Sequence, residues 1–185
     1  RIASCAFDEC KNLEDVIFIE NSKLLSIDKY AFSNSSLKRI SIPSQVEKIC
    51  EKAFFSCDQL ESIEFSDNSK LRLIDKLAFS RSSLSNIYIP SNVDQIGESS
   101  FSFCKKLSKV EFLNHSNLKF IEKEAFVNSS IQSIAIPRSV IRIDEGSFSC
   151  CNNLHKIHFA DGIELESISK DSFSSSAIES ISIPK

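Results

Sequence analysis

The sequence predicts one mostly β solenoid of about eight stacked turns, with a parallel sheet on one face and short 3-10 turns. Three observations predict it. Phenylalanines recur at gaps that alternate between 25 and 22 residues, so that like positions repeat every 47 residues. Each turn carries apolar residues two positions apart, as a half-buried strand does. No stretch keeps a 3.6-residue period long enough for a stable helix. The eight phenylalanines are Phe7, Phe32, Phe54, Phe79, Phe101, Phe126, Phe148 and Phe173.

The composition is that of a soluble domain with one core. The chain has 185 residues, 42% hydrophobic and 25% charged, and a net charge of −3 without runs of one sign. This balance gives no basic stripe for nucleic acid or an anionic membrane. The longest apolar run, Val16 to Ile19, is far shorter than the ~20 residues of a membrane-spanning helix. There is no signal peptide in this stretch and no Met, so we expect a segment or a processed product.

The main strands follow the motif Leu-x-x-Ile-x-Ile/Phe, whose β-branched residues favour strand over helix. In the longer half of each repeat the motif covers residues 13–18, 60–65, 107–112 and 154–159. In the shorter half, where proline follows directly, it covers residues 37–42, 84–89, 131–136 and 178–183. Alternate side chains of each strand should face the core.

The return side of each turn carries a second apolar pair, such as Leu24 and Ile27, before the phenylalanine. We expect a short strand there, and a 3-10 turn around the phenylalanine. Six or so buried apolar side chains at ~1.5–3 kcal/mol each do not offset the ordering of about 23 residues at ~1.5 kcal/mol each. No turn therefore folds alone, and stability comes from the interfaces between turns.

These motifs resemble a known family. The segment from Leu60 to Asn68 fits the leucine-rich-repeat signature L-x-x-L-x-L-x-x-N, and the segment from Leu84 to Cys104 resembles the BspA-like class of microbial surface and adhesion proteins. The resemblance covers residues 1–185 as a single domain, expected to be a segment of a longer array. It implies a non-catalytic protein-binding module, placed at the cell surface or secreted.

The cysteines and histidines do not form a recognisable reactive site. Cys10, Cys57, Cys104 and Cys151 share one repeat position, roughly 10 Å apart if stacked, which is too far for a disulfide. We interpret them as small core residues, and we expect mostly free thiols. His155 and His158 are three residues apart, but they lie in a predicted strand and loop and not on a helical face, which argues against a metal pair. No nucleophile motif or phosphate loop occurs, so we predict no enzyme activity, no metal and no cofactor.

The exposed face of the main strands is the candidate binding site. Its central column holds Ile17, Ser41, Glu64, Tyr88, Glu111, Ala135, His158 and Ser182. Repeat proteins bind partners along such a face. Aromatic and Arg side chains dominate interface energetics, so Tyr88 is the predicted contact centre. The predicted binding residues are Arg39, Glu64, Tyr88, Lys109, Glu111 and His158.

Three alternatives stay open. The column could be an ordinary solvated sheet face. The terminal turns, which carry no caps, could dock end to end on partners or further repeats. The module could also be a structural spacer in an intracellular, cytoplasmic or cytoskeletal assembly. The sequons at Asn34, Asn114 and Asn128 support secretion only weakly, and the compartment, the oligomeric state and the partner are left undetermined by the sequence.

Overall fold

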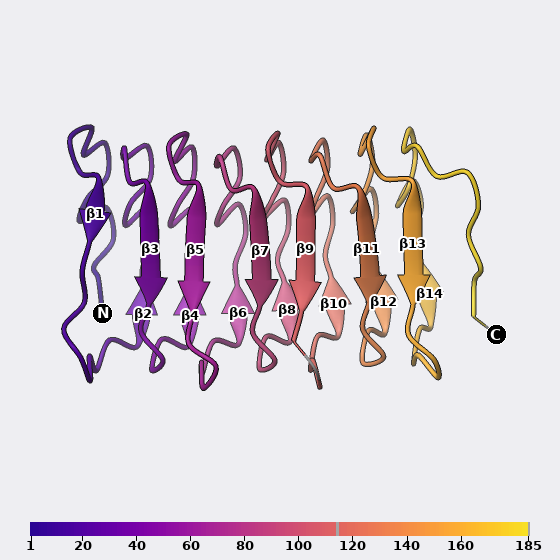
Figure 1. Ribbon diagram of the computed structural model, residues 1–185, viewed down its shortest axis with the longest axis horizontal. Helices are drawn as coiled ribbons and strands as arrows, with labels where there is room; N and C mark the ends of the chain where they lie inside the picture. The colour runs from indigo at the N-terminus through magenta and orange to yellow at the C-terminus, as the bar shows by residue number, and fades with distance from the viewer. Residues whose placement is uncertain (114, 185) are drawn as a thin grey trace.

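The computed structural model describes residues 1–113 and 115–184 and is a parallel β-solenoid (Figure 1). Seven strands run down the front of the molecule and seven short strands run up the back. The front strands are β1 (Asp15–Val16), β3 (Arg39–Ile42), β5 (Ser62–Phe65), β7 (Asn86–Ile89), β9 (Lys109–Phe112), β11 (Ser133–Ile136) and β13 (Lys156–Phe159). The back strands are β2 (Ser26–Ile27), β4 (Lys48–Ile49), β6 (Leu73–Ile74), β8 (Gln95–Ile96), β10 (Phe120–Ile121), β12 (Arg142–Ile143) and β14 (Ser167–Ile168). The predicted fold is thereby confirmed.

The predicted eighth front strand, residues 178–183, is wrong. This segment has no strand assignment, and it runs apart from β13 in Figure 1. Its apolar side chains stay partly in solvent, with Ile181 37% and Ile183 63% exposed. The segment faces another described strand on one side only, so burial contributes less here than in the turns between two neighbours.

A stack of phenylalanine rings fills the edge where each turn passes from back to front. Consecutive rings lie 5.1–5.4 Å apart between centroids, with interplanar angles of 5–10°. The six inner rings are fully buried, whereas Phe7 at one end is 36% exposed. Each stacked aromatic pair adds roughly 0.5–1.5 kcal/mol to the burial of its area. The stack therefore joins every turn to the next.

The chain around each phenylalanine is not the predicted 3-10 turn, and no 3-10 helix occurs in the described residues. The Phe32 amide donates to Ala53 of the following turn at 2.8 Å, while the amides beside it bond within their own turn. Positive φ angles two residues before and after the ring, +58° at Tyr30 and +55° at Asn34, produce this alternation. A 3-10 helix would keep every amide inside one turn. Here every second amide joins neighbouring turns.

A column of alternating serine and cysteine lies beside the ring stack. Cys104 is buried, donates from Sγ to the Phe79 carbonyl at 3.1 Å, and lies 3.4 Å from Ser82 Oγ. Burial raises the pKa of Cys104 to about 11, so its thiol is a poor nucleophile. Cys57 and Cys151 repeat the arrangement, and all seven cysteines are free thiols. The predicted core role is confirmed for these three, whereas Cys10 is only half-buried.

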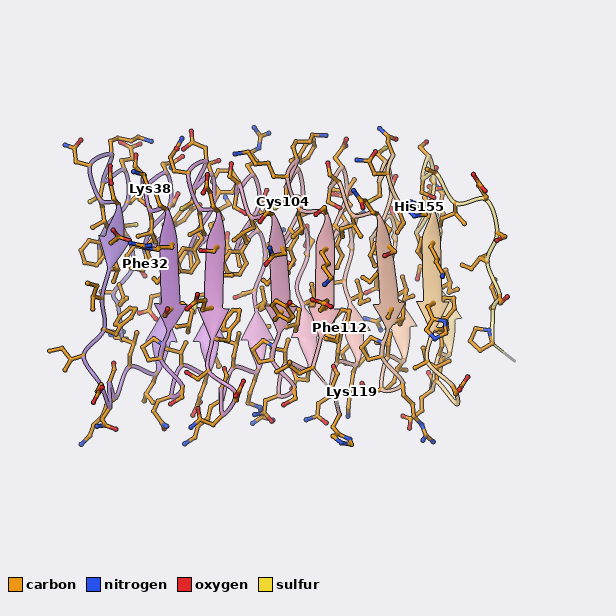
Figure 2. The ribbon with its side chains drawn as sticks, in the orientation of Figure 1. Phe32, Lys38, Cys104, Phe112, Lys119 and His155 are labelled. Atoms are coloured by element: carbon orange, nitrogen blue, oxygen red, sulfur yellow. The ribbon has the colours of Figure 1, made fainter. Side chains whose placement is uncertain are left out.

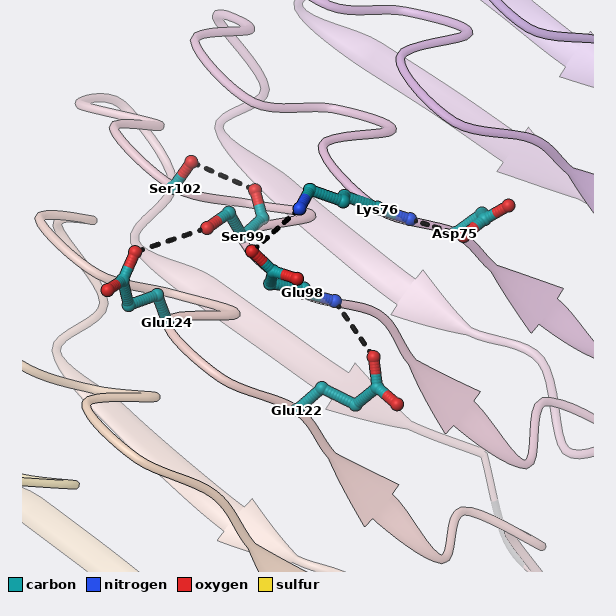
Figure 3. Close-up of polar contacts among 7 residues, drawn as sticks. All are labelled: Asp75, Lys76, Glu98, Ser99, Ser102, Glu122 and Glu124. Carbon is teal, nitrogen blue, oxygen red and sulfur yellow. Dashed lines mark hydrogen bonds and ion pairs between the residues drawn. The ribbon is translucent and has the colours of Figure 1, made fainter. Parts of the chain in front are cut away.

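The back sheet is continuous across all seven turns, in the order β14-β12-β10-β8-β6-β4-β2. Beside it, carboxylates accept backbone amides that have no ladder partner (Figure 3). Glu122 Oε2 accepts the Glu98 amide at 3.1 Å, and its Oε1 accepts from Gln95 at 2.6 Å. Desolvation raises the pKa of Glu122. An ion pair of 2.8 Å between Lys76 and Glu98 also links adjacent turns beside the back sheet.

Candidate binding face

The front sheet is not continuous, and its interruptions follow the 47-residue repeat. Four residue pairs join each of β3–β5, β7–β9 and β11–β13. We call these the closed junctions. Only two pairs join β1–β3, one joins β9–β11, and no strand pairing joins β5–β7. We call these the open junctions.

Proline removes a hydrogen-bond donor at the open junctions. At two closed junctions, the amide after the later strand donates to the last carbonyl of the earlier one, as Leu113 does to Ile89 (3.3 Å) and Ala160 to Ile136 (3.1 Å). At the open junctions the corresponding residue is Pro43, Pro90 or Pro137. Proline has no N–H to donate. Every second junction therefore lacks this last hydrogen bond of the ladder.

The predicted contact centre is an assembled cluster on β7 and β9. Tyr88 is paired in register with Glu111, and its side chain is 52% exposed. Lys109 Nζ lies 2.9 Å from Glu111 Oε2. The Lys109 ammonium, with a smaller effect of the Tyr88 hydroxyl, lowers the pKa of Glu111, and the same ion pair raises the pKa of Lys109. The cluster presents an aromatic ring beside a charged pair.

Arg39 and Glu64 form a second group, apart from the Tyr88 cluster. Arg39 Nε donates to Asp15 at 2.8 Å, and Ser41 Oγ donates to Glu64 at 2.9 Å. Hydrogen bonding to Asp15 raises the pKa of Arg39. These residues line a hollow of about 390 Å³ over β1, β3 and β5. The open β5–β7 junction separates Glu64 from Tyr88.

His158 lies in a cavity that sequence reasoning did not anticipate. This cavity, of about 650 Å³, extends from the end of β9 to β13 and includes Glu111, Ala135 and Arg138. Ala135 is paired with His158, and its small side chain leaves the centre open. In the sequence, the sign of this cavity is the small column residue Ala135, which comes two residues before Pro137.

A cavity of about 800 Å³ occupies the equivalent position two repeats earlier, with Phe18, Ser41 and Pro43 in its lining. Each cavity is lined by residues at the end of a strand that borders an open junction. Between them, Tyr88 occupies the column position that Ser41 and Ala135 hold on either side. The front face thus carries hollows at small column residues and a projecting ring at the large one.

No group of three or more His, Cys, Asp or Glu side chains in residues 1–113 and 115–184 is placed to hold a metal ion. His155 Nδ1 lies 3.0 Å from the Asn153 carbonyl, at the turn edge and not on the front column.

The described part of the chain also offers no helix that could cross a lipid bilayer. The sequon at Asn114 lies outside the described residues.

Comparison with known proteins identifies the repeats. The family model described as "BspA type Leucine rich repeat region" matches residues 1–81 and 72–185, in six copies. No curated protein sequence matches the chain at a significant level.

Solved structures share the fold. The pneumococcal vaccine antigen PcpA is 33% identical over 69% of this chain, with a TM-score of 0.64. A Treponema pallidum leucine-rich-repeat protein is 26% identical over 82% of the chain, with a TM-score of 0.59. A leucine-rich cell-surface protein of Faecalibacterium prausnitzii is 25% identical over 78% of the chain, with a TM-score of 0.55. The chain spans only 32%, 68% and 44% of these three structures, in the same order.

Proposed function

Since the chain belongs to the BspA-type leucine-rich-repeat family, we propose that it is a non-catalytic protein-binding module of a cell-surface protein. The front sheet is its contact face. Two of the similar structures are a pneumococcal vaccine antigen and a bacterial cell-surface protein, which supports a surface location. The partner is a host or matrix protein that lies across several turns.

The observation that carries this proposal is the Tyr88 cluster. A half-exposed aromatic ring lies beside the Lys109–Glu111 ion pair, with cavities one repeat away on either side. Protein interfaces place their binding energy in a few aromatic and charged anchors, and surrounding contacts add shape complementarity. Tyr88 provides such an anchor, and the cavities on either side of it provide a surface shape that a partner can complement.

The proposal is tested with Tyr88→Ala combined with Glu111→Ala. Binding to immobilised extracellular-matrix proteins, measured by surface plasmon resonance, should weaken by at least about fivefold, because truncating an interface anchor costs more than ~1 kcal/mol. The melting temperature should stay unchanged, since both side chains are on the surface.

A matched control truncates Arg72 and Asp94, whose side chains lie 4.0 Å apart at the ends of the back strands. That variant should bind as the wild type does. Equal affinity of the Tyr88/Glu111 variant and the wild type for every matrix protein that binds would exclude this part of the front sheet as the contact face.

A further inference from the structure

A second surface lies on the phenylalanine edge, away from the front sheet. Phe103 follows the buried Phe101 by two residues and is 41% exposed. Its φ is +58°, a left-handed conformation that is costly for a bulky side chain. At the equivalent position the other turns hold Glu9, Asn34, Ser56, Arg81, Asn128, Cys150 and Ser175. An exposed phenylalanine here strains the backbone and contributes little to the core, which indicates a role outside stability.

Cations surround this ring. The Arg81 guanidinium carbon lies 5.4 Å from the Phe103 centroid, and Lys105 Nζ lies 5.6 Å from it. Lys106 is the next exposed residue of the same turn. The ion pairs between described residues do not include any of these three cations. We call Arg81, Phe103, Lys105 and Lys106 the basic edge.

The neighbouring turns add hydrogen-bonding groups without negative charge. Between the ring and the front strand, these turns carry Ser83, Ser85, Asn128, Ser130, Gln132, Asn152 and Asn153, and the turn of Phe103 itself carries Ser108. Lys105 Nζ donates to Asn128 Oδ1 at 3.1 Å. Glu124 precedes the ring of its turn, on the side from which the chain arrives from the back strands, and its carboxylate lies 3.4 Å from Ser99 Oγ (Figure 3). The titratable His155 marks the far end of this edge (Figure 2).

The earlier half of the same edge is different. It carries the carboxylates of Asp8, Glu9, Glu14, Asp58 and Glu61. Lys38, labelled in Figure 2, is neutralised there by Glu14 at 2.8 Å. The positive charge of the basic edge is therefore local, although the chain as a whole carries −3.

We propose that the basic edge binds an acidic polysaccharide. The apolar face of a sugar ring stacks on Phe103, while Arg81 and Lys105 pair with carboxylate or sulfate groups. Asn128 and Ser130 can bond sugar hydroxyls. The front-face cavities described above do not include the basic edge. An exposed ring between two cations suits a sugar better than a peptide, whose side chains need pockets.

Isothermal titration with a heparin-derived sulfated hexasaccharide and with a hexuronate tests this proposal, with maltohexaose as the neutral probe. The acidic probes should bind and maltohexaose should not, and the affinity should fall between about 50 and about 300 mM salt because screening weakens exposed charge pairs. Phe103→Asn suits the left-handed backbone. It should lower the affinity about tenfold, the size expected for a lost ring contact, with an unchanged or raised melting temperature.

The other variants define what would overturn it. Arg81→Gln with Lys105→Gln should weaken binding further, whereas Lys38→Gln should have no effect. Tyr88→Ala with Glu111→Ala should bind the acidic probes normally, so this test is independent of the front-sheet proposal. The proposal fails if Phe103→Asn binds normally, or if it lowers the melting temperature, which would make the ring structural. Equal binding of polyglutamate would also overturn it, because charge alone would then suffice.

Discussion

The phenylalanine stack and the front sheet are made by the same turns of chain, yet only the stack is uniform. Ring spacings vary only between 5.1 and 5.4 Å along the stack. Strand pairing on the front alternates between four pairs at closed junctions and at most two at open ones. The turns are therefore held at a constant spacing by their buried edge, while the exposed face is free to vary.

The phenylalanine stack and the front sheet have different periods. Every turn supplies one ring, so the stack repeats with each turn. Prolines occur in every second turn, so the open junctions repeat every 47 residues. A partner on the front face therefore meets an open junction only at every second turn. The open junctions of the front face therefore recur half as often along the chain as the rings of the core.

The largest effect should come from cutting the stack. Phe101→Ala removes a fully buried ring that lies between two others, and should lower the free energy of unfolding by about 3–5 kcal/mol. Tyr88→Ala on the front sheet should change it by less than about 0.5 kcal/mol. Urea denaturation followed by circular dichroism measures both values. Similar losses for the two variants would mean that the front sheet carries as much stability as the stack.

The sequence predicts the stack and the strands because burial imposes the same residue type at each repeat. Phe54 and Phe101 have equivalent surroundings, and so the period is visible without a structure. The 3-10 turns were mispredicted because the positive φ angles fall on ordinary residues such as Leu77 and Arg81. Glycine or asparagine, the residue types that most readily indicate this conformation, occurs at the positions beside the rings only as Asn34, Asn128 and Gly146.

The site was predictable only in part. The front column follows from strand alternation, which brought Tyr88, Lys109 and Glu111 together. The cavities depend on strand separation at the open junctions, and proline after a strand is a local signal whose effect appears between turns. The basic edge depends on which exposed charges lack partners. Arg81 and Phe103 are 22 residues apart and meet only because the turns stack.

A smaller effect separates two glycines of the back and edge ladders. A Cβ at Gly97 would lie 2.8 Å from backbone atoms of Ile74 and Asp75, so Gly97→Ala should cost about 1–3 kcal/mol. Gly146, with φ +63° and its nearest contact at 3.5 Å, would meet only conformational strain of about 1 kcal/mol. Thermal denaturation ranks the pair. A larger loss of stability for Gly146→Ala than for Gly97→Ala would mean that neighbouring turns move apart to accommodate a Cβ more easily than the uniform ring stack indicates.

The proline explanation can be tested at the β9–β11 junction. Pro137→Ala supplies the missing donor, and the new hydrogen bond of about 1 kcal/mol is largely offset by the added freedom of the unfolded chain. Stability should change by less than about 1 kcal/mol, while the new amide at position 137 becomes protected from hydrogen exchange. The amide of Ala160, already bonded to Ile136, is the internal reference. An unprotected amide at 137 would show that proline is not what opens the junction.

The smallest effect lies in the titration of Glu111. Lys109 and, less strongly, Tyr88 lower the pKa of this carboxyl by favouring its charged form. The ion pair therefore contributes above the unfolded-state pKa and is lost as pH falls through the folded-state pKa. Carbon-13 NMR should find the Glu111 midpoint below its ordinary value. Tyr88→Phe should raise the pKa slightly, and Lys109→Gln should raise it more. If Tyr88→Phe moves the pKa further than Lys109→Gln does, the Tyr88 hydroxyl and not the Lys109 ammonium controls the charge at the centre of the proposed contact face.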